Sequence, residues 1–323
     1  MIIVTGGAGF IGSATIWELN NAGYKDILVV DDQEDGENSD NLKNRAFTSY
    51  MDKKDFIAKV RNRRLEGKVE GIIHMGACSS TTEQDKAYLE ENNLKYTKDL
   101  ALWALENSCR FIYASSAATY GDGKNGFDDD IEGLEKLKPL NLYGWSKQNF
   151  DLWAKKEGVL DQMVGLKFFN VYGPNEYHKE SMKSVACKAF KEIKDSGKLR
   201  LFKSYREDYQ NGEQCRDFVY IKDCTKIILW LLENPEVTGL YNIGSGTAES
   251  WNTLAKACFN ALSLEKNIDY IEMPENIREH YQYHTEARMT KLSATGYTNP
   301  MTALESGVED YFKNYLLQKE PYL

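Results

Sequence analysis

The sequence predicts an α/β fold: a Rossmann-type, doubly wound parallel sheet with a smaller C-terminal α/β domain. Short apolar segments alternate with helix-like stretches along the first half of the chain, and the first of these segments ends in a glycine-rich turn. The 323 residues exceed the usual size of one hydrophobic core, which favours two domains. Hydrophobic residues at 42% and charged residues at 28% are typical of a globular protein.

The first half of the chain follows a strand–helix rhythm that begins at Ile2. An apolar strand leads into the glycine turn and a helix closed by Gly23, and the next apolar strand ends at Asp31. We predict strands at 2–4, 27–30, 71–74, 110–113 and 163–169, and helices at 13–22, 86–107 and 141–156. Because these strands are apolar on both faces and separated by helices, we expect a parallel sheet covered on both sides.

The rhythm changes after Pro174. Residues 177–194 have a helical pattern, residues 199–220 are polar and irregular, and a strand at 240–243 precedes a helix at 249–262. We therefore expect that 1–174 form the dinucleotide-binding domain, rejoined by 237–263, and that 175–236 and 264–323 form the substrate-binding domain.

The turn after the first strand matches a dinucleotide fingerprint, Gly7-x-Gly9-x-x-Gly12. Glycines permit a tight turn and a close approach of the pyrophosphate, whose charge then faces the N-terminus of the following helix. Asp31, at the end of the next strand, can accept hydrogen bonds from ribose hydroxyls. By charge the acidic stretch there disfavours a 2′-phosphate and favours NAD, although three nearby cations could still reach in. The acidic residues are Asp31, Asp32, Glu34, Asp35 and Glu37, and the cations are Lys43, Arg45 and Lys53.

A Tyr143-x-x-x-Lys147 pair lies on the predicted helix at 141–156, and positions i and i+4 share one face of a helix. We expect the ammonium group and an oxidised nicotinamide to lower the pKa of Tyr143 from its usual value of about 10. The tyrosine could then take a hydroxyl proton as hydride leaves for the cofactor. Ser116 ends a preceding strand and can hydrogen-bond the reacting oxygen, and Lys147 can also bind the nicotinamide ribose.

Composition and charge exclude several classes of protein. The net charge is −9 with no basic stripe, so no nucleic-acid partner is expected. The sequence has no apolar run of about 18 residues and no room for a signal peptide before Ile2, so we expect a cytoplasmic protein with free thiols and no membrane span. The acidic run 128–130 is interpreted as a solvated surface. His280 and His284 lack a third ligand, so no metal site is predicted.

These motifs resemble the extended short-chain dehydrogenase/reductases that modify nucleotide sugars, in whose pattern the glycines are Gly6, Gly9 and Gly12. Longer segments, in order along nearly the whole chain, are similar to the ADP-L-glycero-D-manno-heptose 6-epimerase family. They are His74–Glu83, Tyr113–Gly121, Phe169–Pro174, His178-Lys179 and Arg216–Tyr220. The Gly-Ala-Cys-Ser-Ser-Thr-Thr-Glu segment at 76–83 and the His-Lys pair are the most specific of them.

The resemblance implies a reaction without net oxidation. The heptose is oxidised at C6″, and the same hydride returns to the opposite face of the ketone. Two acid/base groups are needed, matched by Tyr143 and Lys179; a lysine in a closed pocket has its pKa lowered by desolvation, although the sequence alone would make Lys179 an ordinary surface lysine. The resemblance further implies NADP, an ADP-sugar substrate, a homopentamer, and supply of the heptose donor for the lipopolysaccharide core.

The resemblance also implies binding residues. The cofactor contacts are Gly6, Gly9, Phe10, Ile11, Gly12, Asp31, Asp32, Lys53, Met75, Gly76, Ala77, Cys78, Ser79, Asn92, Lys147, Val171 and Lys179. The substrate contacts are Ser116, Asn170, Ser181, Lys188, Phe202, Lys203, Ser204, Tyr205, Arg216 and Tyr281. Arg216 suits a bidentate grip on a diphosphate, and Phe202 can pack on an adenine.

Four positions depart from the family pattern. Asn38 and Asp32 replace a lysine and an asparagine, which weakens the transfer of NADP and leaves NAD open. Lys188 stands where a histidine is usual, and Asn175 where an arginine is frequent.

Three other functions share parts of this pattern. A second nucleotide-sugar epimerase activity, on a UDP-, GDP- or dTDP-hexose, would share Tyr143 and Lys147. A 4,6-dehydratase needs an Asp-Glu pair after the catalytic serine, where this chain has Ala117-Ala118-Thr119. A cofactor-binding sensor without turnover commonly loses the catalytic tyrosine or lysine, and this chain keeps both.

Overall fold

The computed structural model describes residues 1–32, 39–278 and 281–323. Its centre is a seven-stranded sheet in the order β10-β6-β5-β4-β1-β2-β3, in which every pairing is parallel. The strands are β1 (Ile2–Thr5), β2 (Ile27–Asp31), β3 (Ser49–Asp52), β4 (Gly71–His74), β5 (Arg110–Ser116), β6 (Val164–Phe168) and β10 (Gly239–Ile243). The prediction of a Rossmann-type parallel sheet is confirmed.

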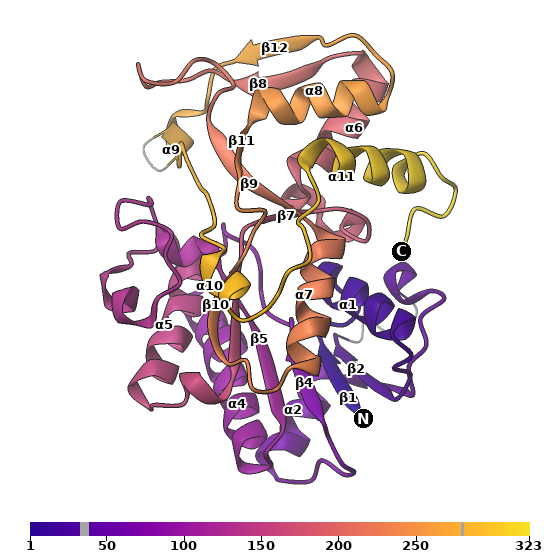
Figure 1. Ribbon diagram of the computed structural model, residues 1–323, viewed down its shortest axis with the longest axis vertical. Coiled ribbons are helices and arrows are strands. Elements are labelled where there is room, and N and C mark those ends of the chain that lie inside the picture. The colour runs from indigo at the N-terminus through magenta and orange to yellow at the C-terminus, as the bar shows by residue number, and fades with distance from the viewer. Residues whose placement is uncertain (33–38, 279–280) are drawn as a thin grey trace.

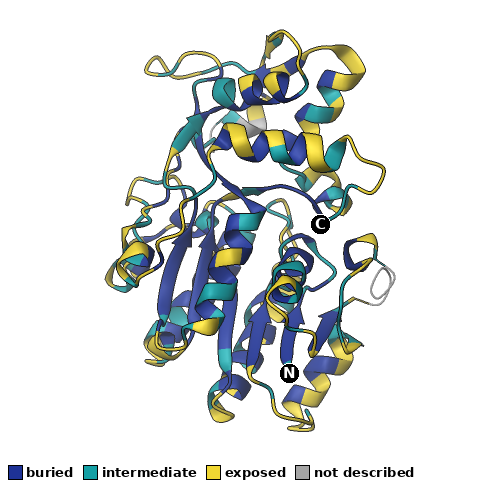
Figure 2. Ribbon diagram, turned by 45° about the vertical axis from the view of Figure 1, so that its right-hand side comes forward, coloured by how far each residue is buried: buried dark blue, intermediate teal, exposed yellow. Residues whose placement is uncertain are grey.

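Helices cover both faces of this sheet (Figure 1). They are α1 (Phe10–Asn21) and α7 (Ile221–Glu233), which pack together, and α2 (Lys53–Arg61), α3 (Lys86–Leu89), α4 (Tyr96–Glu106) and α5 (Leu142–Lys156). Alternate residues of β1 enter two separate cores, because Ile2 and Val4 join the cluster under α1 and α7 while Ile3 joins the cluster under α2, α4 and α5. The strands are accordingly buried on both faces and the helices only on their inner sides (Figure 2).

The predicted helix at 86–107 contains an irregular turn. Between α3 and α4 the backbone forms a π-helical segment, η2 (Glu90–Lys95), which carries Asn92 and Asn93. Such wide turns occur mostly as single turns inside α-helices, frequently at functional sites.

The second half of the chain builds two small sheets above the large one, in the orders β11-β9-β7 and β12-β8. Their strands are β7 (Asn170–Tyr172), β8 (Leu199–Phe202), β9 (Cys215–Tyr220), β11 (Ala248–Ser250) and β12 (Ile268–Ile271). The helices are α6 (Val185–Ser196), α8 (Trp251–Ala261), α9 (Glu275–Arg278), α10 (Thr290–Ala294) and α11 (Leu304–Tyr311), the last continued by the π-helical η7 (Phe312–Leu316). Short 3₁₀ turns are η1 (Asp40–Leu42), η3 (Ala117–Tyr120), η4 (Ile131–Lys136), η5 (Leu160–Gln162) and η6 (Tyr177–Met182).

Two expectations about this half were wrong. The helical pattern at 177–194 is interrupted, because η6 contains Glu180 at φ 44° and α6 starts afresh with the Ser184 side chain capping the Cys187 amide. The stretch at 199–220 is not irregular throughout but contains β8 and β9. Buried charged residues hide β9 from a hydrophobicity pattern, because Arg216 and Asp217 lie inside that strand.

The predicted domain boundaries stay a prediction. Strand β10 pairs with β6 in the large sheet, while α8, which follows it, packs against α6 and α11. Helix α7 packs against α1. The chain therefore passes more than once between the large sheet and the elements above it.

The acidic run 128–130 is not simply a solvated surface. Asp129 is buried, and its Oδ2 accepts a hydrogen bond from the Asn242 amide at 2.8 Å, while Asp128 pairs with Arg288. Burial raises the pKa of the Asp129 carboxyl. The run ties its loop to β10, and three neighbouring carboxylates with these partners carry no metal assignment.

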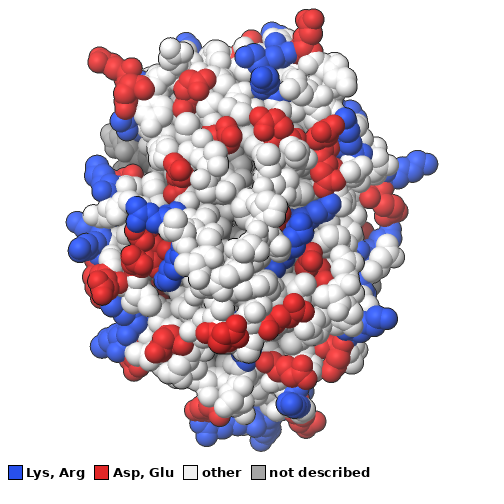
Figure 3. Space-filling model, viewed as in Figure 1, with Lys and Arg blue, Asp and Glu red and all other residues white. Residues whose placement is uncertain are grey.

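Surface charge on the face of Figure 3 is mixed, with acidic and basic side chains interspersed. In the part of the chain that the structure covers, no helix combines the length and hydropathy that a membrane crossing requires. His280, the first of the two histidines considered for a metal, lies outside the described residues.

Candidate active site

The glycine turn between β1 and α1 is packed too closely for side chains. Gly6 has φ +65°, and a Cβ there would lie 2.5 Å from the backbone nitrogen of Gly76, which follows β4. A Cβ on Gly12 would collide with the Gly6 carbonyl oxygen. Gly9, at the start of α1, offers no side chain to cap the first amides, which are thus available to an anion. This cradle fits the pyrophosphate of a dinucleotide.

The end of β2 gathers four predicted cofactor contacts: Asp31, Asp32, Lys53 and Asn92. Asp31 Oδ2 accepts a hydrogen bond from the Ala8 amide at 2.8 Å, which fixes this carboxylate against the glycine turn. Burial raises the pKa of Asp31. Lys53 Nζ bonds Asp32 Oδ2 at 2.8 Å and Asn92 Oδ1 at 3.4 Å, so residues from β2, α2 and η2 meet at one place.

The other cations near this strand end are also engaged. Lys43 pairs with Glu320 at 3.0 Å, and Arg45 donates to the main-chain oxygen of Leu323. Asn38 and the acidic residues Glu34, Asp35 and Glu37 lie outside the described residues. A 2′-phosphate would therefore have to compete with Glu320 for Lys43 and with the Leu323 main-chain oxygen for Arg45.

Tyr143 lies in the first turn of α5, whose N-cap Asn141 accepts a hydrogen bond from the Gly144 amide at 2.8 Å. The prediction that Lys147 lowers the pKa of Tyr143 is wrong. Burial raises the pKa of Tyr143, and a hydrogen bond with the Ser116 hydroxyl only partly offsets that rise. Ser116 and Tyr143 are thus brought together, as the strand end and the helix start require.

Lys147 does not lower the Tyr143 pKa because its ammonium turns to the sheet. Its Nζ donates to the Ala114 carbonyl of β5 at 2.8 Å, and burial lowers the Lys147 pKa to about 8. The lysine therefore braces the strand that ends in Ser116.

The loop after β4, which contains the predicted contacts Met75 to Ser79, is held by a residue that sequence reasoning missed. Asn93 accepts a hydrogen bond from the Cys78 amide at 2.9 Å and donates to the Cys78 carbonyl at 3.0 Å. It also donates to the Ser146 hydroxyl on α5 at 3.0 Å. A buried asparagine needs several partners, but the sequence carries no signal for it, because Asn93 lies in the polar run Glu90–Lys95 and only the structure shows its burial.

Lys179 projects from η6 toward the cofactor turn. Its Nζ lies 5.3 Å from the centroid of the Phe10 ring, and Phe10 is the first residue of α1. Burial lowers the pKa of Lys179, and the nearby Glu176 carboxylate partly opposes this. No hydrogen bond joins Lys179 to Tyr143 among the described residues.

Glu176 fastens the segment that carries Lys179. Its buried carboxylate accepts hydrogen bonds from the Gly173 amide at 3.2 Å and from the Ser184 hydroxyl at 2.7 Å, and also from the Ser184 amide. These partners lie before and after η6, so one side chain ties both ends of the excursion together.

Arg216 on β9 is a buried cation with 8% exposure. Its guanidinium stacks near the rings of Trp251 and Tyr281, at 5.6 and 5.1 Å, and donates to the Cys215 carbonyl at 2.8 Å. It forms no ion pair with any described residue, and burial lowers its pKa. The Trp251 indole donates to the Tyr281 hydroxyl oxygen at 2.9 Å, which leaves the Tyr281 proton free for another acceptor.

Most of the other predicted substrate contacts lie in the loop after β8 and around η6, and the Tyr205 amide reaches the Arg216 surroundings by donating to Tyr283, whose ring contacts Tyr281. Lys203 pairs with Glu272 at 2.7 Å, the Tyr205 hydroxyl donates to the same carboxylate, and Arg278 stacks on Tyr205 at 4.0 Å. Lys188 donates to the Ser181 carbonyl at 2.6 Å. Phe202 ends β8 and the Ser204 amide bonds Asn211, so both flank Lys203, while Asn170 begins β7.

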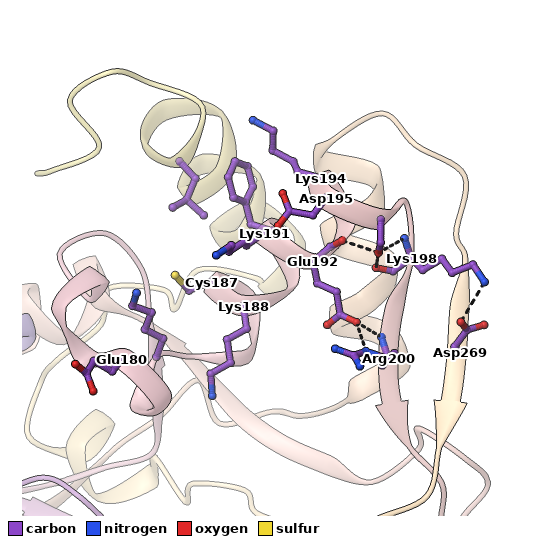
Figure 4. A pocket seen from close by; sticks show the side chains of 14 residues that line it. Glu180, Cys187, Lys188, Lys191, Glu192, Lys194, Asp195, Lys198, Arg200 and Asp269 are labelled. Atoms are coloured by element: carbon purple, nitrogen blue, oxygen red, sulfur yellow. Dashed lines mark hydrogen bonds and ion pairs between the residues drawn. The ribbon is translucent and has the colours of Figure 1, made fainter.

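A hollow of about 930 Å³ lies beside α6 and β8 rather than at Tyr143 (Figure 4). Lys188 lines it, but Tyr143, Lys147 and Arg216 do not. Several of its charges are already paired, with Lys198 bonded to Asp269 at 3.2 Å and Arg200 to Glu192 at 2.7 Å. The hollow is therefore distinct from the place where Ser116 and Tyr143 meet.

The comparison with known families matches residues 2–244 to the NAD dependent epimerase/dehydratase family. The ADP-L-glycero-D-manno-heptose-6-epimerase of Nitratidesulfovibrio vulgaris (strain DP4) is 52% identical over 323 residues, which is 100% of both chains. Its counterpart in Fusobacterium nucleatum is 47% identical over 332 residues and again covers 100% of each chain. The solved structure of Helicobacter pylori ADP-L-glycero-D-manno-heptose-6-epimerase is similar with a TM-score of 0.80 and 28% identity, over 97% of this chain and 95% of that chain.

Proposed function

The chain belongs to the NAD dependent epimerase/dehydratase family, and we propose that it interconverts ADP-D-glycero-D-manno-heptose and ADP-L-glycero-D-manno-heptose. The observation that carries this proposal is the similarity at 52% identity over the full length of a heptose epimerase. The juxtaposition of Ser116 and Tyr143 beside the dinucleotide cradle supports it from the site itself.

Tyr143 and Ser116 act on the oxygen at C6″. When held at the glycine turn of Gly6, Gly9 and Gly12, a nicotinamide dinucleotide would supply the hydride chemistry at C6″. As the C6″ hydroxyl becomes a ketone, Tyr143 takes its proton as a phenolate, a form that the positive charge of an oxidised nicotinamide would favour, while the Ser116 hydroxyl holds the same oxygen. Lys147 on α5 donates to the Ala114 carbonyl of β5 and so holds this helix and strand together. The Tyr143 and Ser116 oxygens therefore meet the substrate from one side.

Lys179 serves the other face of the ketone. Once the ketone has turned, Lys179 donates a proton to its oxygen as the hydride returns, and in the reverse reaction it accepts that proton. A lysine with its pKa lowered by burial can exchange a proton at lower pH than an exposed lysine can. Glu176 keeps this lysine on a fixed segment.

Arg216 and Tyr281 bind the diphosphate of the ADP group. Among the described residues, the buried guanidinium has no carboxylate partner and the Tyr281 hydroxyl proton has no acceptor, so both gain from a dianionic ligand. Phe202, half-buried at the end of β8, offers a ring for the adenine.

The cofactor is a nicotinamide dinucleotide, and its finer identity is part of this proposal. The family resemblance implies NADP, whereas the pairing of Lys53 with Asp32 and of Lys43 with Glu320 favours NAD. We also propose a cytoplasmic homo-oligomer, a pentamer by resemblance. Native mass spectrometry of the purified protein reads out the retained cofactor and the subunit number together.

The direct test is incubation with ADP-D-glycero-D-manno-heptose in deuterated water, followed by NMR. We expect the L-glycero epimer to appear with no deuterium at C6″, because the hydride returns to the carbon it left. UDP-, GDP- and dTDP-hexoses run in parallel test the second candidate, another nucleotide-sugar epimerase. Turnover of one of those hexoses and none of ADP-heptose would assign the protein to the second candidate function. Deuterium at C6″ would show that the reaction proceeds by deprotonation of the carbon rather than by its oxidation.

A further inference from the structure

A buried ion pair lies directly behind the catalytic strand and helix. Asp151 is on α5, one turn beyond Lys147, and Lys167 is on β6; their side chains have no exposed surface and are joined at 3.0 Å. Neither belongs to the binding or catalytic residues named above. Burying two charges is costly, and an apolar pair of similar size is often as stable, so stability alone does not explain this one.

The ion pair is connected to two alternate residues near the end of β5, Tyr113 and Ser115. The Asp151 carboxylate accepts hydrogen bonds from the Tyr113 hydroxyl at 2.9 Å and from the Ser115 hydroxyl at 2.7 Å. Tyr113 and Ser115 point to the same face of β5, because they are two positions apart. They alternate with Ala114, which Lys147 binds, and with Ser116. Asp151 thus fixes the strand from one face, while Lys147 binds the Ala114 carbonyl.

Lys167 extends the connection to Ser116. Its ammonium donates to the Thr119 hydroxyl at 2.6 Å, and Thr119 in turn donates to the Ser116 carbonyl at 2.8 Å. The ammonium also lies 5.0 Å from the centroid of the Tyr120 ring. The hydrogen-bond directions are consistent, since the hydroxyl accepts from the lysine and donates to the carbonyl.

We propose, building on the function above, that Asp151 and Lys167 are positioning residues that hold Ser116 in place and keep Lys147 charged. The charge of Asp151 raises the pKa of Lys147 against the effect of burial. The titratable groups that interact with the charge of Lys147 are Asp151 on α5, His74 on β4 and Cys78 in the loop after β4, and Tyr143 lies one turn earlier on α5. Of these, only Asp151 is a carboxylate.

The test is a titration of Lys147 by ¹³C NMR in protein labelled at lysine Cε, with the signal assigned by its loss in Lys147→Arg. We expect the wild-type pKa of Lys147 to be about 8 and to fall in Asp151→Asn. We also expect kcat for epimerisation to fall roughly tenfold with KM little changed, because the reacting groups are displaced rather than removed.

The double variant Asp151→Leu/Lys167→Met guards against loss of the fold, because it removes both charges of the ion pair together. We expect it to fold, and to show the same lowered Lys147 pKa and reduced kcat. The matched control is Glu135→Gln/Lys155→Gln, which removes an exposed ion pair of 2.8 Å at the end of the same helix and should change neither quantity.

A wild-type pKa for Lys147, or a wild-type kcat, in either folded network variant overturns the proposal. The titration needs no substrate. If the wild-type protein does not turn over ADP-heptose, the proposed function fails while the pKa comparison still decides the role of Asp151.

Discussion

The two sides of the candidate site differ in how their buried cations are satisfied. On the sheet side, Lys147 and Lys167 each donate to specific oxygen acceptors, the Ala114 carbonyl and the Asp151 carboxylate. On the loop side, Lys179 lies against the Phe10 ring, and Arg216 lies against two rings with one carbonyl as its acceptor. Neither loop-side cation forms an ion pair within the described ranges.

This difference indicates that the two sides of the candidate site have different roles. Desolvating a charge costs several kcal/mol unless a partner compensates it, so an unpaired buried cation weakens the protein until an anion arrives. The buried cations of the sheet side have protein oxygen acceptors without any ligand, so this side is suited to hold reacting atoms in place. On the proposed function, we expect the negative charge of the substrate and cofactor to compensate the cations of the loop side.

The largest expected effect removes the acid/base group of the sheet side. Tyr143→Phe keeps the ring and its packing but has no proton to exchange, so epimerisation should fall on the order of a thousandfold. Native mass spectrometry should still find the cofactor, because the glycine cradle is unchanged. Tyr88→Phe, at an exposed tyrosine of α3, is the control. Near-normal turnover of Tyr143→Phe would remove it from the mechanism.

The corresponding change on the loop side is Lys179→Met. We expect a loss on the order of a hundredfold in kcat, since one face of the ketone loses its proton donor. Lys183→Met, just beyond η6, tests whether any lysine in this segment has the same effect. Equal losses in both variants, or none in Lys179→Met, would contradict the assigned role.

Arg216→Met separates binding from chemistry. We expect KM for ADP-heptose to rise roughly tenfold or more, because hydrogen bonds to a charged group are lost, while kcat changes little. The free protein should be at least as heat-stable as wild type, since an unpaired buried charge is gone. Stabilisation by added ADP should largely disappear. Arg200→Met, at an exposed cation paired with Glu192, should keep both properties.

If Arg216→Met instead lowers the melting temperature of the free protein strongly, the guanidinium is compensated within the fold and the contrast between the two sides is false.

The smallest effect concerns pH and a sheet-side histidine. His74 on β4 lies between the Thr5 and Thr97 hydroxyls, at 2.6 and 2.9 Å, and burial lowers its pKa to about 3. The unfolded chain binds a proton at this histidine below about pH 6.5 and the folded protein does not, so stability is lost as the pH falls from there toward 3.

Urea denaturation at pH 7 and pH 4.5 measures this loss. His74→Gln should lose less of its free energy of unfolding between the two pH values than wild type does, whereas the exposed His284→Gln should match wild type. An identical pH dependence in His74→Gln would show that this histidine is protonated in the fold.

The sequence by itself determined the features that neighbouring residues create. Apolar strands between helices specify a parallel sheet, Gly6 and Gly12 specify a turn that no side chain could enter, and Tyr143 and Lys147 share a helix by their spacing. Each of these depends on residues a few positions apart, so local pattern suffices.

Only the tertiary structure decided where charges are buried and what pairs with them. The raised pKa of Tyr143, the turn of Lys147 toward Ala114, the Asp151–Lys167 pair and the aromatic surroundings of Arg216 all join segments distant in the chain. Burial and pairing set the energy of a charge, and both are properties of the packed whole rather than of any stretch of sequence.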